Sequence, residues 1–332
     1  MSRDIYVVAE QRDGSIAKVS FELIGEATKL AADLDQKVYA VLMGADIKGQ
    51  CQPLIEAGAD GVVYVEDELL KEYVTEPYAK ALTAVIKQCE PEIVLYGATS
   101  IGRDLAPRVA ARIHTGLTAD CTKLDIDPET KLLMMTRPAF GGNIMATIVC
   151  REYRPQMATV RPGVMQRIEA VPGKTGEVKE LKVAFTDADM NVTIKEVIKQ
   201  SHKTKDITEA KVLVSGGRGI GSAEYYKTLQ ELADLLDGDI SSSRANVDAG
   251  WIAKDRQVGQ TGKTVRPNLY LACGISGAIQ HIAGMEDAEC VISINKNDTA
   301  AIFDVSDLGI VGDLKVIVPK LIDALKKYKA AN

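Results

Sequence analysis

Residues 269–285 read Leu-Tyr-Leu-Ala-Cys-Gly-Ile-Ser-Gly-Ala-Ile-Gln-His-Ile-Ala-Gly-Met. An apolar run ends at Gly274, a short turn with a second glycine follows, and apolar residues resume at helical spacing from Ala278 to Ala283. This pattern predicts a strand, a tight turn and a helix. Such a junction directs free backbone N–H groups and the positive end of a helix dipole at one point, which suits a phosphate or pyrophosphate.

The composition favours a globular protein of two domains. The chain has 332 residues, 46% of them hydrophobic, and its apolar runs are all far shorter than a membrane helix, so we do not expect an integral membrane protein. A net charge of −6 argues against nucleic-acid binding, which needs clustered Lys and Arg. The first nine residues carry a strand pattern and lack the features of a secretory signal, so we expect a cytoplasmic protein.

The cysteines and histidines do not suggest a metal centre. The six cysteines are widely spaced without a CxxC pair, and the three histidines lie far apart in sequence. We therefore expect reduced thiols in the core and no zinc or iron–sulfur site.

The first half of the chain alternates short β-branched runs with helical patterns. The strand-like runs are 5–9, 37–42, 61–65 and 93–96, and the clearest helical patterns are 21–34 and 73–89. This alternation predicts a mainly parallel sheet flanked by helices. Between residues 118 and 161, consecutive strand-like runs predict an antiparallel or mixed extension of that sheet.

A loose, charged connection follows from about residue 166, where prolines and glycines increase and apolar residues become fewer. We therefore predict an N-terminal α/β domain over residues 1–200, including this linker, and a second domain over residues 208–332. Each domain should contain its own parallel sheet.

The joint at residues 97–113 allows two interpretations. Gly97, Ser100 and Gly102 could present a helix N-terminus to a nucleotide, with three arginines along one side of the helix. Alternatively, this is a close-packed strand-to-helix joint whose arginines meet a partner subunit. We favour the second interpretation, because short glycine motifs often match by chance.

The second half opens with a strand and a glycine turn at residues 210–221, followed by a helical pattern at 223–236. The glycines do not have the G-x-G-x-x-G spacing of a dinucleotide fingerprint. Arg218 nevertheless lies in the turn at the carboxyl end of a strand, where α/β sheets collect ligands, so we expect it to contact an anion or a cofactor. Further along, a strand at 290–294 precedes Asn295, and a terminal helix should begin near residue 314.

Several blocks of the chain carry a resemblance to a known family. In the second half these are Ser-Gly-Gly-Arg-Gly (215–219), Ser-Ser-Arg-Ala-x-Val-Asp-Ala-Gly (242–250), Val-Gly-Gln-Thr-Gly-Lys (258–263), Gly-Ile-Ser-Gly-Ala-Ile-Gln-His-x-Ala-Gly-Met (274–285), Ile-x-Ile-Asn-Lys (292–296) and Asp-Leu-Gly-Ile-Val-Gly-Asp-Leu (307–314). Their order and spacing resemble the alpha subunit of electron transfer flavoproteins. Val-Val-Ala-Glu (7–10) and residues 97–108 extend the resemblance over nearly the whole chain.

The resemblance implies a heterodimer that carries electrons. The C-terminal domain would be a Rossmann-like fold that binds one FAD, and the N-terminal domain would pack on a beta subunit without binding a nucleotide. The protein would accept electrons from one oxidoreductase, such as an acyl-CoA dehydrogenase or another flavin or quinone oxidoreductase, and pass them to a second one. It would be an electron-carrier subunit more than a stand-alone enzyme.

By the same resemblance, FAD would be contacted by Arg218, Ser243, Arg244, Val258, Gly259, Gln260, Thr261, Ser276, Gly277, Ala278, Ile279, Gln280, His281, Asn295, Asp313 and Leu314. Arg244, Thr261 and His281 would lie nearest the isoalloxazine ring. A guanidinium and a histidine donor beside a flavin that gains negative charge would raise its potential. For His281 the alternative is a core histidine whose ring is satisfied by the backbone.

The residues alone allow alternatives on two further points, the class of protein and the mode of electron transfer. An NAD- or nucleotide-dependent enzyme, or a nucleotide sensor subunit, could use a related domain, although the chain shows no activated nucleophile near the glycine turns. Simple relay and flavin-based bifurcation, with or without NADH oxidation, would both depend on the partner subunit and its AMP or second FAD.

Overall fold

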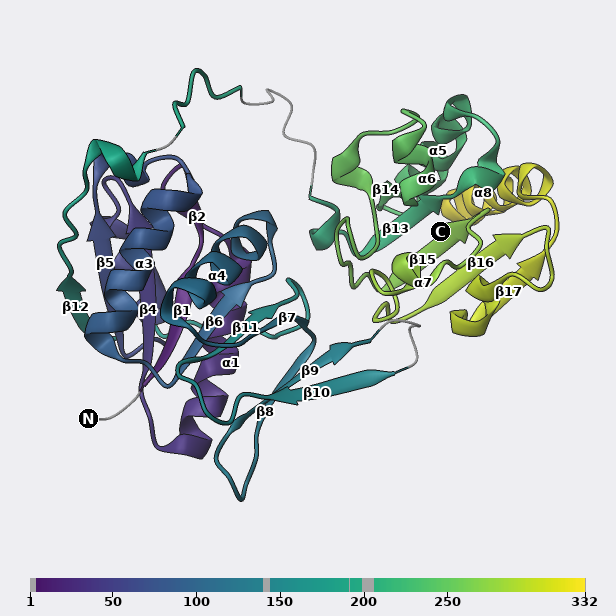
Figure 1. Ribbon diagram of the computed structural model, residues 1–332. Helices are drawn as coiled ribbons and strands as arrows, with labels where there is room; N and C mark the ends of the chain where they lie inside the picture. The colour runs from purple at the N-terminus through teal and green to yellow at the C-terminus, as the bar shows by residue number, and fades with distance from the viewer. Residues whose placement is uncertain (1–3, 140–143, 191, 199–205, 332) are drawn as a thin grey trace. The chain divides into compact units, whose positions relative to one another are not determined.

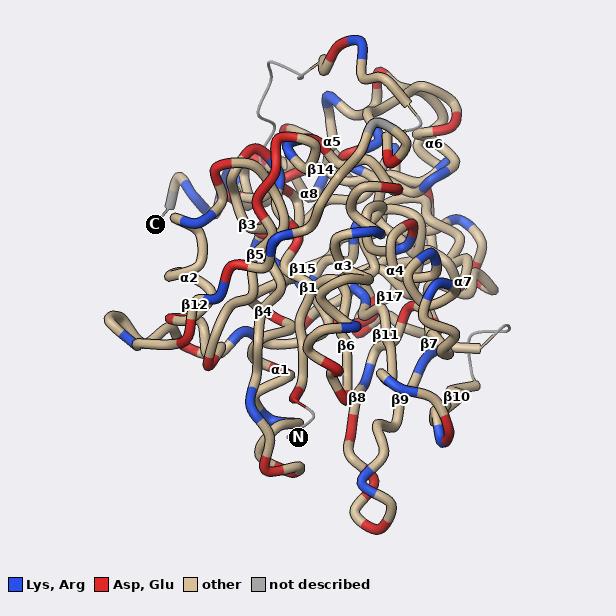
Figure 2. Tube along the Cα trace, turned by 60° about the vertical axis from the view of Figure 1, so that its left-hand side comes forward, with Lys and Arg blue, Asp and Glu red and all other residues tan. Residues whose placement is uncertain are grey.

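The computed structural model describes residues 4–139, 144–190, 192–198 and 206–331. The chain forms two compact units, Met1–Ile198 and Lys199–Asn332, and each contains a parallel sheet with helices (Figure 1). Within the described ranges, no helix combines the length and apolar character needed to cross a bilayer. Figure 2 shows Lys and Arg interspersed with Asp and Glu along the chain of both units.

The first unit is built on a seven-stranded parallel sheet in the order β12-β5-β4-β1-β6-β11-β7. Its strands are β1 (Ile5–Ala9), β4 (Val38–Gly44), β5 (Gly61–Glu66), β6 (Ile93–Gly97), β7 (Leu117–Cys121), β11 (Gln156–Val160) and β12 (Glu177–Glu180). Ile5 and Val7 enter one hydrophobic core while Tyr6 and Val8 enter the other, so β1 is buried on both faces. This confirms the predicted parallel sheet.

Helices cover both faces of this sheet. α1 (Lys18–Leu34) and α2 (Cys51–Glu56) contribute to one core, and α3 (Thr75–Cys89) and α4 (Ser100–Ile113) contribute to the other. In α1 the buried apolar residues recur at helical spacing, from Leu23 and Ile24 to Leu30 and Ala31. The helix ends where Asp35 adopts a left-handed conformation.

The segment from 118 to 161 differs from the prediction of a sheet extension. β11 is a parallel strand between β6 and β7 inside the main sheet. A separate antiparallel sheet is formed by β8 (Lys123–Ile126), β9 (Leu133–Pro138) and β10 (Met145–Val149). Residue patterns identified only some of these strands and could not assign their partners, because alternation along a strand is independent of which neighbour it pairs with.

The stretch that we expected to be a loose connection contains the edge strand β12. All four of its residues are exposed, and it pairs in parallel with β5. A polar, exposed edge strand has no apolar periodicity, so the sequence pattern could not reveal it. The remaining short strands of the unit are β2 (Gln11–Arg12) and β3 (Ser15–Ile16).

The second unit is a five-stranded parallel sheet in the order β14-β13-β15-β16-β17. Its strands are β13 (Val212–Gly216), β14 (Asp239–Ser242), β15 (Leu269–Cys273), β16 (Val291–Asn295) and β17 (Leu308–Val311). The chain therefore starts at β13, moves to one side for β14, and then reverses to place β15 on the other side. In a doubly wound sheet this reversal leaves a crevice at the carboxyl ends of the strands.

The two faces of the second sheet are covered differently. α5 (Tyr226–Leu235) and α8 (Leu314–Ala331) pack on one face over Val214, Leu271 and Ile294. The other face is covered mainly by connecting segments, including Val258, Ile275 and Met285. Short helices α6 (Arg244–Asp248) and α7 (Ile279–Ile282) follow β14 and β15. Single 3-10 turns occur at Lys48–Gln50, Glu68–Leu70, Asp187–Asp189, Ile207–Glu209, Arg218–Ile220, Ala223–Tyr225, Lys254–Arg256 and Ala301–Val305.

The helix predicted after Gly274 is only one turn long. α7 has four residues and is followed by turns. A helix this short has little macrodipole, since the dipole grows from aligned peptide units. Any affinity of this junction for an anion must therefore come mainly from individual N–H groups.

Candidate functional site

A hollow of about 560 Å³ lies at the carboxyl ends of β13 and β15, where the strand order of the second unit reverses. Two hydrogen bonds join the turns that follow these strands: Gly217 N–H donates to Cys273 O at 2.9 Å, and Gly219 N–H donates to Gly274 O at 3.1 Å. A Cβ on Gly217 would lie 2.3 Å from Gly274 O, so this approach requires glycine.

Most residues singled out by the resemblance line this hollow. They are Arg218, Ser243, Arg244, Val258, Gly259, Gln260, Thr261, Ser276, Ala278, Gln280, His281 and Asn295. They come from the ends of four strands and from the loop at 257–263, so segments up to about eighty residues apart in sequence meet at one crevice, as parallel topology requires.

Gly277, Ile279, Asp313 and Leu314 do not line the hollow. Gly277 has a φ of +85°, and a Cβ there would lie 2.1 Å from Ile302 N, so its role is to bring the loop against the segment at Ile302. The Asp313 carboxylate accepts from Lys315 N–H at 2.9 Å at the start of α8 and pairs with Lys296 Nζ at 3.1 Å. The Ile279 side chain is 49% exposed.

Residues 275–280 present a run of backbone donors. Within the described part of the chain, none of their six N–H groups donates a hydrogen bond to a protein acceptor. Their carbonyls, in contrast, anchor the loop: Ile275 O accepts from Asn295 Nδ2 at 2.8 Å, and Ser276 O accepts from Ile302 N–H at 3.2 Å. Consecutive free N–H groups on a fixed loop form a concavity for an anion such as a pyrophosphate.

The lining of the hollow is positively charged. It includes Arg218 and Arg244, and none of the described residues that line it is Asp or Glu. Arg244 Nε lies 3.2 Å from Asp248 Oδ2, one turn along α6, and both side chains are well exposed. An exposed pair of this kind holds the guanidinium only weakly, so Arg244 can turn toward a ligand.

The loop at 257–263 is anchored against α7. Gln260 N–H donates to Gln280 O at 2.7 Å, and Gly259 N–H donates to Lys263 O at 3.1 Å. The Thr261 hydroxyl oxygen accepts from Gln257 Nε2 at 2.9 Å, which leaves the hydroxyl proton available as a donor.

His281 is 6% exposed and both of its ring nitrogens have protein partners. Nδ1 lies 3.1 Å from Val258 O, and Nε2 lies 2.9 Å from the Tyr270 hydroxyl. Burial lowers the pKa of His281 to about 4, and the bond to Val258 O only partly opposes this. The ring therefore borders the hollow as a neutral group, with hydrogen bonds of the kind expected for a core histidine.

Several lining residues were not identified from the sequence: Gly217, Gly219, Ala245, Gln257, Gly274 and Ile275. Gly217, Gly219, Gly274 and Ile275 lie in the turns directly after β13 and β15. What these residues share is their position directly after neighbouring parallel strands, whose carboxyl ends converge. This position can be recognised only when the order of the strands in the sheet is known.

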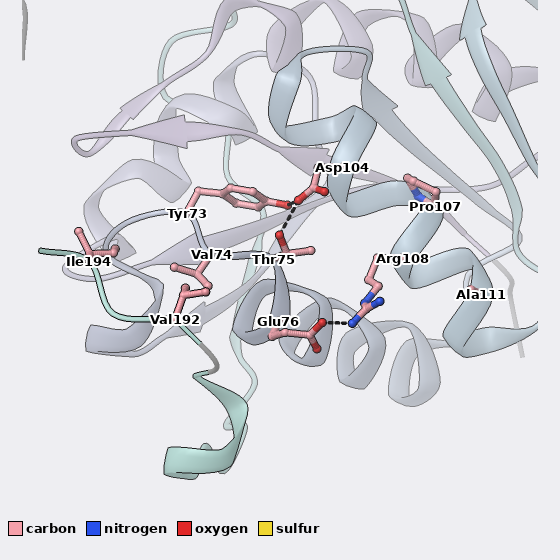
Figure 3. Close-up of a pocket in the computed structure, with 10 residues that line it drawn as sticks. All are labelled: Tyr73, Val74, Thr75, Glu76, Asp104, Pro107, Arg108, Ala111, Val192 and Ile194. Atoms are coloured by element: carbon pink, nitrogen blue, oxygen red, sulfur yellow. Dashed lines mark hydrogen bonds and ion pairs between the residues drawn. The ribbon is translucent and has the colours of Figure 1, made fainter. Parts of the chain in front are cut away.

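A second hollow, of about 760 Å³, lies in the first unit beside α3 and α4 (Figure 3). Its polar groups satisfy one another. The hydroxyls of Tyr73 and Thr75 both donate to Asp104 at 2.6 Å, and Glu76 pairs with Arg108 and Arg112. Although this hollow is larger than the one in the second unit, it therefore offers a ligand few unpaired polar groups.

The joint at 97–113 in the same unit is closed. A Cβ on Gly102 would lie 1.8 Å from Gly97 O, and the Thr99 hydroxyl, which caps α4, also donates to the Glu10 carboxylate at 2.5 Å. Its arginines pair with carboxylates of the same unit, including Arg103 with Asp120 at 3.4 Å. Close packing agrees with the first part of the interpretation that we favoured, whereas contact of these arginines with a partner subunit stays a prediction.

Comparisons with known proteins decide the family. Residues 5–186 match the model of the electron transfer flavoprotein domain, and residues 206–286 match that of the electron transfer flavoprotein FAD-binding domain. The chain is 52% identical over 327 residues to the electron transfer flavoprotein subunit alpha of Thermoanaerobacterium thermosaccharolyticum, covering 98% of this chain and 99% of that protein. The chain belongs to the electron transfer flavoprotein alpha subunits.

Other relatives carry more specific names. The chain is 45% identical to the acryloyl-CoA reductase electron transfer subunit beta of Anaerotignum propionicum, covering 99% of this chain and 97% of that protein. It is 41% identical to the LctC subunit of a lactate dehydrogenase (NAD(+),ferredoxin) from Acetobacterium woodii, covering 98% of this chain and 77% of that protein. The predicted family, its α/β fold and its FAD cofactor are confirmed, and the family implies a beta subunit and oxidoreductase partners.

The low pKa of His281 makes a prediction for stability. In the unfolded chain the histidine takes up a proton near its ordinary pKa of 6.5, whereas in the folded protein it does so only near 4. Its contribution to stability is thus complete above pH 6.5 and is lost as the pH falls from 6.5 toward 4, by about 3 kcal/mol in all. We expect His281→Gln to remove this part of the pH dependence.

The measurement is denaturant unfolding at pH 7.5 and pH 4.5, followed by fluorescence. The only tryptophan, Trp251, lies in the second unit and reports on its unfolding. His114→Asn, an exposed position in the first unit, is the control and should keep the wild-type pH dependence. An identical pH dependence in wild type and His281→Gln would show that His281 is not buried as a neutral group.

Proposed function

We propose that the alpha subunit holds its FAD in the hollow at the ends of β13 and β15. One observation carries this proposal: the loop at 275–280 has six consecutive backbone N–H groups without described protein acceptors, and four of its residues line a crevice that contains two arginines and no described carboxylate. FAD carries two negative phosphates that need such donors, and the cofactor supplies the redox chemistry when bound.

The residues divide by the chemistry that they offer. The N–H groups of 275–280 and the Ser276 hydroxyl suit the pyrophosphate, while Asn295 and Asp313 suit the ribose and adenine end. Arg244, Thr261 and His281 belong at the isoalloxazine end. Arg244 would stabilise the negative charge gained on reduction, and Thr261 would donate its free hydroxyl proton.

The first unit is proposed as the platform for the beta subunit. Met135 on β9 is buried in the core, and Ile148, its partner on β10, lies on the same face but is 41% exposed. Ile144, just before β10, is 64% exposed. An apolar face that continues beyond the core of its own unit suits a partner protein, and β10 is an edge strand of its sheet. In this assignment residues 1–200 pack on the beta subunit, with a connection from about 166, and 208–332 carry FAD.

The electron partners are proposed from chemistry and from the names of relatives. We propose exchange with an acyl-CoA dehydrogenase or another flavin or quinone oxidoreductase. The names of the relatives from A. propionicum and A. woodii, with acryloyl-CoA in one and NAD(+) and ferredoxin in the other, support this range, including a bifurcating complex. We also propose a cytoplasmic location, supported by six cysteines that are all free thiols.

The function is tested by co-expressing the chain with its beta subunit and counting the flavins in the purified heterodimer. We expect a flavin absorption spectrum, with one FAD held by the alpha subunit. NADH oxidation coupled to reduction of two acceptors would identify bifurcation, and electron exchange with a reduced acyl-CoA dehydrogenase alone would identify relay. A colourless complex that retains a nucleotide would instead indicate a sensor or a nucleotide-dependent enzyme.

Arg244→Ala should lower the potential of the bound flavin. Removing a cation that favours the reduced, anionic ring about tenfold corresponds to about 59 mV for one electron. A reductive titration of the heterodimer measures this shift. Arg266→Ala is the matched control, because Arg266 is exposed, pairs with Asp287 at 2.8 Å and does not line the hollow. Equal flavin potentials in both variants would show that Arg244 does not lie at the isoalloxazine end.

Ile148→Asp should weaken the heterodimer, because it places a charge on the apolar face that we assign to the beta subunit. Val178→Asp is the control: Val178 lies on the edge strand β12 of the same unit and is 43% exposed, much like Ile148. Size-exclusion chromatography over a dilution series measures dissociation. Weakening by Val178→Asp alone would place the interface at β12.

A further inference from the structure

The loop at 257–263 is closed on itself by its backbone. Lys263 N–H donates to Gln257 O at 2.8 Å, and Gly262 N–H donates to Gly259 O at 2.9 Å. A Cβ on Gly262 would lie 2.4 Å from Gln257 O, so the two ends of the loop approach each other as closely as glycine allows. Gln257 therefore lies at the base of the loop, where it closes.

The side chain of Gln257 bridges the loop from this base to Thr261. Gln257 is 4% exposed and borders the hollow, and its Nε2 donates to Thr261 Oγ1 at 2.9 Å. A buried amide is costly unless it is hydrogen bonded, so this contact stabilises the side chain where it lies. Thr261, in contrast, is exposed.

The direction of this hydrogen bond determines what Thr261 can offer to a ligand. A hydroxyl has one proton and two lone pairs, and the amide nitrogen can only donate. Gln257 therefore occupies a lone pair of the Thr261 oxygen and leaves its proton unused. Within the described part of the chain, neither this hydroxyl proton nor the Thr261 backbone N–H has a protein acceptor. Thr261 thus holds two free donors.

The base of the loop is attached to the sheet on both sides of Gln257. The preceding residue, Arg256, pairs with Asp239 on β14 at 3.1 Å, and both side chains are largely buried. The following residue, Val258, donates its N–H to Ser242 O at the end of β14 at 2.9 Å. The sheet therefore fixes the backbone at Gln257, and the side-chain amide extends this fixed frame into the loop.

We infer that Gln257 is a positioning residue for the flavin site: its amide holds the Thr261 hydroxyl by the oxygen and thereby directs the hydroxyl proton to the cofactor. This inference rests on the proposed location of FAD. An oxidised isoalloxazine ring carries nitrogen and carbonyl oxygen atoms that accept hydrogen bonds. A donor that is already held in place meets such an acceptor at a lower entropic cost than a freely rotating hydroxyl.

The amide contact can be tested by NMR of the full chain without FAD. In 15N-labelled protein, Gln257→Met assigns the side-chain amide signals of Gln257. We expect nuclear Overhauser effects from its Nε2 protons to the methyl group of Thr261, and a shift of these signals in Thr261→Val. If the carbonyl end of the amide faced Thr261, or if Thr261→Val left the signals unchanged, the inference would be overturned.

The link to the cofactor is tested in the heterodimer by a double-mutant cycle on FAD affinity and flavin potential. Gln257→Met should weaken FAD binding about tenfold, the effect of losing one hydrogen bond, and should shift the potential in the same direction as Thr261→Val. In the Thr261→Val background it should change neither quantity further, because Gln257 acts through Thr261. Additive effects would indicate a direct contact between Gln257 and FAD and would overturn the inference.

Gln230→Met is the matched control. It makes the same substitution in the same unit and removes a similar bond, from the Gln230 amide to Asp234 at 2.8 Å, but Gln230 does not line the hollow. We expect wild-type FAD affinity and potential in this variant. An equal loss in Gln230→Met and Gln257→Met would reduce the effect of Gln257 to general destabilisation and would overturn the inference.

The outcomes separate this inference from the proposed function. If the heterodimer binds no FAD, the proposed site is wrong, whereas the spectra of the cofactor-free chain still test the contact between Gln257 and Thr261. If Gln257→Met fails to fold, wild type and Thr261→Val decide, because the Overhauser effects and the shift on Thr261→Val do not depend on that variant once the signals are assigned through the backbone.

Discussion

The pairing of β13 with β15 is the constraint on which the second unit depends. These strands are neighbours in space although β14 lies between them in sequence, and the turns after them are joined by the bonds from Gly217 and Gly219. Glycine is needed because two backbones approach within the space that a Cβ would occupy. This contact fixes where residues 275–280 lie, and therefore where their N–H groups point.

The first unit has a crevice at the equivalent point of its sheet, but that crevice is closed. Its strand order also reverses, between β1 and β6, but the crevice there is nearly filled, with about 20 Å³ left. Gln11 Nε2 donates to the Tyr78 hydroxyl oxygen at 3.2 Å across that crevice, and the Glu10 carboxylate accepts from Thr99 at the start of α4. A carboxylate at this point repels an anion. Parallel topology thus creates the position of a site, and the side chains decide whether the site is open.

The sequence predicted the elements that have strong local patterns. The parallel sheets, α1, α3 and α8, and the junction at Gly274 follow from apolar periodicity and glycine position. β12 and the pairing of β8 to β11 could not be predicted, because exposed strands lack periodicity and pairing is a long-range property. The length of α7 was overestimated, because apolar residues continue at helical spacing past Ile282 although the helix ends there. The residues around the hollow were identified through resemblance, whereas the partners of His281 needed coordinates, since Tyr270 reads as an ordinary core residue.

The donors at 275–280 also affect how the protein behaves when the cofactor is absent. Ser276, Ala278, Ile279 and Gln280 are exposed, so water can hydrate several of these N–H groups, while the carbonyls on the same loop stay bound to Asn295 and Ile302. Bonds within the protein thus hold the shape of the loop, so binding of FAD at the proposed site would cost little conformational entropy. By the same argument, loss and rebinding of FAD at that site would not require unfolding of the domain.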